Sequence, residues 1–176
     1  MIKLFFKYVM YFSLFIASFI FFFPKDNLYY LLEKKLSENK LIISNEVLEE
    51  KLLSYSIKKP DIYYENTKVS QLKDISFEML FFKNSIKLSN IKIVDDFKKM
   101  LPENIDFITV THNIKNPILL DIQSKGEFGT LSGTIRLYDK IVNINLNASN
   151  KMKQKYKSIL KQMQLQKGVY TYEYKY

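Results

Sequence analysis

The first 23 residues constrain this chain most, because they form one long apolar run with a basic start. The run from Tyr8 to Phe23 contains 16 residues without a charge, and Pro24 follows it. Extending it back to Leu4 gives 20 residues and includes Lys7. A helix needs about 20 apolar residues to cross a bilayer, and a lysine near its end can reach the headgroups. The run therefore predicts a transmembrane helix over about residues 4–23. The expected span includes Leu4, Tyr8, Phe15 and Phe23.

A cleaved signal peptide is the alternative interpretation of this segment. Cleavage requires small residues just after the apolar core. Here Ser13, Ala17 and Ser18 lie inside the run, and bulky aromatic residues with Pro24 follow it. The pattern favours an uncleaved signal anchor. Residues 1–25 would be the membrane anchor, and residues 26–176 would form one extracytoplasmic β-rich domain of ordinary size.

The orientation of the anchor depends mainly on its short basic N-terminus. Lys3 and Lys7 precede the run, while Lys25, Lys34 and Lys35 follow it among acidic residues. Orientation rules count Lys and Arg on each side, and the two counts are nearly equal. The short basic tail favours a cytoplasmic N-terminus. We expect a single-pass protein of the bacterial inner membrane with its C-terminal domain in the periplasm. The lack of cysteine fits either side.

The positive charge of the chain is concentrated in its last part. The chain has 27 basic and 18 acidic residues, and residues 140–176 contribute eight lysines but only one acid, Glu173. The rest of the domain is nearly neutral. Arg136 is the single arginine, whereas nucleic-acid and phosphate sites favour arginine for its bidentate geometry. The composition thus predicts no nucleic-acid partner.

Apolar periodicity predicts a helix followed by a sheet. Leucines at helical spacing give residues 27–38 one apolar face, with Asp26 as the cap. Beyond them, apolar and polar residues alternate, which indicates antiparallel strands with one buried face. A turn is expected at residues 83–85, a slip at Ser89-Asn90, and a short helix over 95–101 capped by Asp95. The helix leucines are Leu28, Leu31, Leu32 and Leu36. The expected strands cover residues 53–57, 62–64, 75–81, 86–93, 105–111, 118–122, 126–137, 141–146 and 169–176.

The predicted fold class is α+β. It combines an N-terminal transmembrane helix with a domain dominated by an antiparallel β-sheet and a few packed helices. Three of the four glycines lie within residues 126–133. Glycine in this context allows tight turns, bulges or close backbone approach.

A lysine-rich helix is expected over residues 151–166, capped by Asn150. Its narrow apolar stripe consists of Met152, Tyr156, Ile159, Leu160 and Met163. Such a helix can attract anionic lipid headgroups, at about 1 kcal/mol per lysine near the surface, or an acidic partner. The commoner alternative is a solvated helix packed on the sheet through its stripe. The candidate contacts with an anionic surface are Lys151, Lys153, Lys155, Lys157 and Lys161.

Residues that carry catalytic chemistry are sparse. His112 is the only histidine, and it would need a carboxylate such as Asp106 or Asp121 to act as a base. The pairs Glu49-Glu50 and Asp95-Asp96 lack the spacing of a metal site, and residues 126–129 lack the ending of a phosphate loop. We therefore expect no enzyme activity, no cofactor, no metal and no catalytic residue.

The order of these features resembles type II secretion system protein N, a family within the larger AsmA-like group of inner-membrane-anchored β-rich proteins. The shared layout is a basic N-terminus, an anchor ending in Phe22-Phe23-Pro24, a leucine-bearing helix and an antiparallel sheet. The best-matching stretch is residues 126–135 followed by 141–146, similar to the G-x-(L/F)-G-x-L-x-G hairpin of those sheets. The lysine-rich segment has no counterpart that maps onto the family. The resemblance implies a periplasmic domain that supports envelope export or handles lipid.

Two functions follow from this pattern. The first is a non-enzymatic membrane protein whose domain binds or scaffolds a cell-envelope component, as in type II secretion-like export. The alternative is a lipid-binding or lipid-transport module of AsmA-like type, in which lysines meet anionic headgroups. The expected partners are the bilayer, an envelope protein and a lipid ligand. An apolar sheet face left open, rather than filled by the domain's own helices, would favour the second function.

Overall fold

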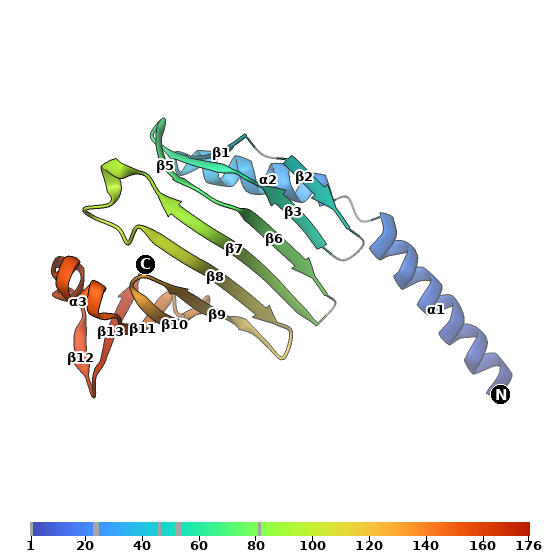
Figure 1. The fold of residues 1–176 in the computed structure, drawn as a ribbon. Coiled ribbons are helices and arrows are strands. Elements are labelled where there is room, and N and C mark those ends of the chain that lie inside the picture. Colours follow the sequence, from blue (N-terminus) through green and yellow to red (C-terminus); the bar gives the residue numbers. More distant parts are fainter. Residues whose placement is uncertain (1, 23–24, 46, 52–53, 81) are drawn as a thin grey trace.

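One large antiparallel sheet dominates the fold. The computed structural model describes residues 2–22, 25–45, 47–51, 54–80 and 82–176. In this part of the chain, 13 strands form a single sheet, accompanied by a few helices (Figure 1). The prediction of a domain dominated by an antiparallel sheet with packed helices is confirmed.

The chain begins with helix α1 (Ile2–Phe22), which extends away from the sheet (Figure 1). Leu4, Tyr8 and Phe15 all lie in α1, and each side chain is more than half exposed. Phe23, the expected end of the span, lies outside the described residues. The helix itself is where the apolar run predicts it.

The transmembrane part of that prediction is not confirmed. Among the residues that the structure describes, no helix is long and apolar enough to cross a membrane.

Helix α2 (Lys25–Glu38) confirms the second predicted helix. It begins before Asp26, so this residue lies inside the helix and is not its cap. Tyr29, Leu32 and Leu36 contact the first core cluster, whereas Leu31 is exposed. The ring of Tyr29 lies 5.9 Å from the ring of Tyr55 on the sheet. The buried stripe of α2 thus centres on a tyrosine that the leucine pattern did not include.

The sheet is a path of strands with one branch. Its main order is β1-β4-β5-β7-β8-β9-β10-β11-β13-β12, and β2-β3-β6 forms a branch that also joins β7. The first strands are β1 (Leu41–Ser44), β2 (Val47–Glu50), β3 (Ser54–Lys58), β4 (Asp61–Tyr64), β5 (Thr67–Gln71) and β6 (Asp74–Met79). The long central strands are β7 (Lys83–Ile93), β8 (Asn104–Asn113), β9 (Asn116–Gly126), β10 (Gly129–Arg136) and β11 (Ile141–Ala148). The last two are β12 (Gln164–Gln166) and β13 (Val169–Lys175).

Strand β7 changes partner at Asn90, where a slip was predicted. It pairs with β6 as far as Ser89 and with β5 from Lys92. Asn90 between them has a left-handed backbone conformation with φ 49°, a region that asparagine tolerates better than most residues. The turn predicted at residues 83–85 is wrong, because these residues begin β7. Leu80 and Lys83 exchange two backbone hydrogen bonds, so the turn lies just before β7.

Glycines permit close backbone contacts in the β9–β10–β11 meander. Gly129 follows a two-residue turn and has φ +113, and a Cβ there would lie 2.1 Å from the Asn147 oxygen. A Cβ at Gly133 would lie 2.6 Å from the Asn143 oxygen. Neither contact is sterically possible, so the predicted role of these glycines in turns and close approach is confirmed.

The predicted helix over residues 151–166 is wrong in length. The segment forms two short helices, α3 (Asn150–Lys155) and α4 (Lys157–Leu160), and then enters β12. The cap is Ser149, whose Oγ accepts a hydrogen bond from the Met152 N–H at 3.1 Å. The break falls at Tyr156, which is buried and whose hydroxyl donates to the Lys98 carbonyl at 3.1 Å. The buried ring fixes the backbone at Tyr156, so one continuous helix does not form across this residue.

The helix predicted over residues 95–101 is also shorter than expected. The structure has a 3-10 helix, η1 (Asp95–Phe97), preceded by Val94 at the cap position. The Asp95 carboxylate pairs with Lys98 at 2.7 Å. A salt bridge to the following turn therefore replaces the predicted capping role of Asp95.

Candidate functional site

Strand register places most of the apolar side chains of the central strands on one face. Phe77 lies opposite Ile86, which lies opposite Val110, and the row continues across β9 to β13. A neighbouring row runs parallel to it and contains Leu120, Ile135 and Val142. We call the uncovered part of these two rows the open apolar face. It consists of Ile86, Val110, Leu120, Ile122, Ile135, Val142, Ile144 and Tyr172.

The helices cover the two ends of this same face. A third row contains Ile75, Leu88 and Ile108 at one end and Leu131, Leu146 and Tyr170 at the other. Helix α2 packs on the first end, in the core cluster around Tyr55 and Ile57. Helices α3 and α4 pack on the second end, through Met152 and Leu160. The open apolar face lies between these helices and belongs to neither core cluster.

Exposure changes sharply along one row of the sheet. Phe77, beside the first core, is 9% exposed, whereas Ile86, its cross-strand neighbour on β7, is 37% exposed. At the far end of the row Tyr172 is again 37% exposed. The side chains between them are half-buried. Aliphatic residues thus form a partly solvent-exposed surface across the middle of the sheet.

The opposite face of the sheet is mostly polar. One row across it contains Ser76, Lys87, Thr109, Gln123, Ser132, Asn145, Thr171 and Gln164. The adjacent positions include Asn143 and Glu173. Polar side chains on this face can keep their hydrogen bonds to water, so the two faces of the sheet differ in chemistry as well as in coverage.

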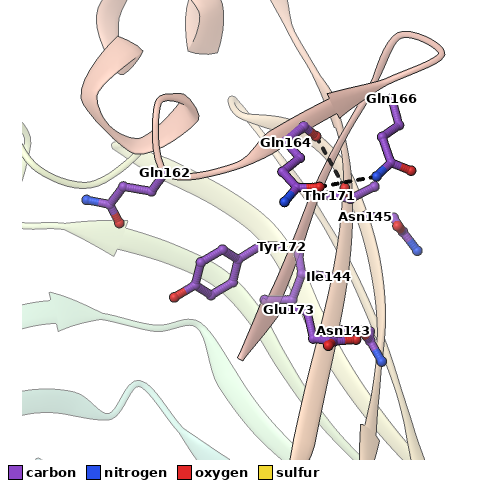
Figure 2. Close-up of a pocket in the computed structure, with 9 residues that line it drawn as sticks. All are labelled: Asn143, Ile144, Asn145, Gln162, Gln164, Gln166, Thr171, Tyr172 and Glu173. Atoms are coloured by element: carbon purple, nitrogen blue, oxygen red, sulfur yellow. Dashed lines mark hydrogen bonds between the residues drawn. The ribbon is translucent and has the colours of Figure 1, made fainter. Parts of the chain in front are cut away.

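A pocket of about 580 Å³ lies where β12 ends beside β13 (Figure 2). Gln166 donates to the Gln164 side-chain oxygen at 3.3 Å, and Thr171 donates to the Gln164 carbonyl at 3.2 Å. The sequence did not reveal this pocket, because residues 164–166 were predicted to end a helix. Its lining is mostly amide and hydroxyl groups. The lining residues are Asn143, Ile144, Asn145, Gln162, Gln164, Gln166, Thr171, Tyr172 and Glu173.

Lys151 is already paired within the domain. Its ammonium lies 2.7 Å from the Glu127 carboxylate, which also accepts a hydrogen bond from Asn104 at 2.8 Å. The bond from Lys151, and then that from Asn104, lower the pKa of Glu127, and the same carboxylate raises the pKa of Lys151. The ammonium of Lys155 lies 5.5 Å from the centre of the Tyr156 ring. All five candidate lysines are exposed: Lys151, Lys153, Lys155, Lys157 and Lys161.

His112 does not meet either candidate carboxylate. Its Nε2 lies 3.1 Å from the Pro117 carbonyl. Asp121 pairs with Thr111, so it faces the opposite side of the sheet from His112. Asp106 lies six residues away along β8. Within the described ranges, no group of three or more acidic or histidine side chains is placed to hold a metal ion.

Comparisons with known proteins return no relative: no family model, no curated protein and no solved structure matches this chain. The resemblance to type II secretion system protein N therefore stays a prediction from the sequence. The two features of the structure that bear on function are the exposed apolar helix α1 and the open apolar face.

Proposed function

We propose that this chain is a non-enzymatic binding protein of the cell envelope, held at a lipid surface by α1, that binds a lipid acyl chain on its open apolar face. The observation that carries the proposal is the aliphatic surface left uncovered between α2 and the α3–α4 pair. The sequence had left lipid binding as the alternative to protein scaffolding. An open face, rather than one filled by the domain's own helices, favours the lipid.

Helix α1 supports attachment to lipid because its apolar side chains are exposed in every direction. Phe5, Phe6 and Val9 are all exposed, as are Phe12 and Phe15 further along the helix. A helix that is apolar on all sides requires either a protein core or lipid around it. The sheet domain supplies no such cover to these side chains. We propose that α1 embeds them in the bilayer, with the domain on the periplasmic side.

The open apolar face has suitable dimensions for an acyl chain. From Ile86 on β7 to Tyr172 on β13 the row crosses six strands, and strands lie about 4.8 Å apart, so it spans about 24 Å. One leaflet of the hydrocarbon core is about 15 Å thick. Burial of apolar surface contributes about 25 cal/mol per Å². A single extended acyl chain therefore fits along this row and is stabilised by the aliphatic side chains.

Glycine at the middle of the row supports the same proposal. Gly133 lies between Ile122 and Ile144 in the strand register. Any side chain at this position would project between its two aliphatic neighbours. No side chain therefore projects from the centre of the open apolar face at this position.

A photoreactive phospholipid with a diazirine on its acyl chain tests the proposal in the full chain. The protein is reconstituted in vesicles, irradiated and digested, and the labelled peptides are identified by mass spectrometry. We expect label on α1 and also on peptides from β8 to β11. Label confined to α1 would overturn binding on the sheet while leaving the membrane attachment intact.

A reporter fused after residue 176 tests the location of the domain. An enzyme reporter that is active only outside the cytoplasm should be active in this fusion. Activity of a cytoplasm-specific reporter instead would contradict the periplasmic part of the proposal.

A further inference from the structure

The outer edge of β13 is paired along only part of its length. On its inner side, β11 pairs with Tyr170 to Lys175. On its outer side, β12 pairs only with Val169 to Thr171. In the described chain no other strand lies against the outer edge beyond Thr171. The pocket in Figure 2 opens at this point, next to Tyr172 and Glu173.

The free backbone groups on this edge belong to Glu173 and Lys175. In an antiparallel ladder, alternate residues direct their N–H and C=O groups to the same side. The Tyr176 N–H donates inward to the Lys140 carbonyl at 3.0 Å. Even-numbered residues thus bond toward β11, and Glu173 and Lys175 direct their backbone groups outward. Exposed groups of this kind are a template for another strand.

We propose that two copies of the chain pair through this edge, antiparallel, with the two-fold axis at Tyr174. In this register Glu173 of each copy lies opposite Lys175 of the other. These are the residues whose backbone groups face outward, so each pair exchanges two ladder hydrogen bonds. The two-fold arrangement satisfies the free edge of both copies at once.

Side-chain chemistry in this register is self-complementary. Glu173 and Lys175 lie on the polar face and form two opposite-charge cross-strand pairs, which stabilise antiparallel strands. Tyr172 and Tyr174 lie on the other face, and Tyr174 meets Tyr174 of the second copy. Tyr174 is 53% exposed in the single chain. Pairing would therefore cover an exposed aromatic ring and extend the apolar face across both copies.

The edge of β13 and the edge of β2 also differ in their charged residues. An edge lysine usually prevents strand pairing, and Lys175 alone would fit that role. Glu173, however, lies two residues away on the same face of the strand. In a two-fold pair, each Glu173 therefore compensates the charge of Lys175 in the other copy. Strand β2 carries Glu49 and Glu50 side by side, and self-pairing there would bring the acids of two copies together. Of these two edges, the β13 edge is the one that matches itself.

Charge reversal tests the register in the full chain in detergent micelles. Glu173→Lys and Lys175→Glu each replace both attractive pairs with like charges. We expect each variant to raise the dimer dissociation constant about tenfold, measured by sedimentation equilibrium. An equimolar mixture of the two variants should recover the wild-type constant, because the mixed pair restores opposite charges. Equal association of wild type, variants and mixture would overturn the proposal.

A cysteine placed on the two-fold axis tests the same geometry without altering charge. The natural chain has no cysteine. Tyr174 would face its own copy as a non-hydrogen-bonded pair with Cα atoms about 4.5 Å apart, within the range of a disulfide. Tyr174→Cys should form a covalent dimer on mild oxidation, whereas Tyr172→Cys should not, because its two copies lie about four residues apart along the strands. Equal cross-linking of both variants, or none in either, would overturn the two-fold register.

Discussion

The two cores and the open apolar face contain the same kinds of residue but differ in what covers them. In the first core, Ile57 is 0% exposed and Tyr29 of α2 packs above its neighbours. On the open apolar face, Ile86 is 37% exposed although it lies in the same row as Phe77. Alternation of apolar residues thus defines a face of the sheet. Whether that face becomes a closed core or stays open to solvent depends on a helix elsewhere in the chain.

Truncating one isoleucine in each region should show the largest difference. Ile57→Ala should lower the free energy of unfolding by about 2–5 kcal/mol, because it leaves a cavity in a closed core. Ile122→Ala on the open apolar face should cost about 1 kcal/mol or less, because solvent already reaches this surface. Urea unfolding of both variants measures the comparison. Equal losses would mean that the open apolar face is packed as tightly as the core.

Removing one hydroxyl should have a smaller effect that is confined to the second core. The Tyr156 hydroxyl donates to the Lys98 carbonyl and links α3 and α4 to the segment after η1. Tyr156→Phe should lower the free energy of unfolding by about 1 kcal/mol, since a part-buried hydrogen bond is lost. The same change at exposed Tyr172 is the matched control and should be nearly neutral. A larger loss at Tyr172 in urea unfolding would contradict this assignment.

Acid should weaken the second core slightly through Glu127. Its pKa is lowered by the hydrogen bond from Lys151 and then by that from Asn104. A carboxylate with a lowered pKa in the folded state stabilises the protein above its unfolded pKa, and this contribution is lost as pH falls through the folded pKa. Glu127→Gln should therefore reduce the loss of stability on acidification below about pH 4.5.

Thermal unfolding measured from pH 7 to pH 3 checks this expectation, with Glu50→Gln on the exposed strand β2 as the control. Because Lys151 is well exposed, the effect should be the smallest of the three. An unchanged pH profile in Glu127→Gln would show that this ion pair does not stabilise the folded state.

Much of the fold could be predicted from periodicity alone. The alternation in residues 75–80, 105–111, 141–146 and 169–175 corresponds to strands in the structure. Strands β1, β2, β5 and β12 were missed because they are short and their apolar residues do not alternate clearly. The helix predicted over 151–166 failed because Tyr156 contacts Lys98, a partner 58 residues away that no local pattern reveals.

The candidate site was less predictable than the fold. The lysines were identified from charge, but the pairing of Lys151 with Glu127 depends on the turn between β9 and β10. The open apolar face depends on where α2, α3 and α4 end, and the pocket depends on β12. These are relations between distant segments, so a single sequence does not show them.

Native mass spectrometry of the full chain, released gently from detergent, tests lipid binding on the open apolar face most directly. The key comparison is Ile122→Lys with Gln123→Lys, which add the same charge to opposite faces of β9. We predict a co-purifying lipid on the wild type and on Gln123→Lys, and its loss from Ile122→Lys. A wild type without lipid, or a lipid retained equally by both variants, would contradict the account.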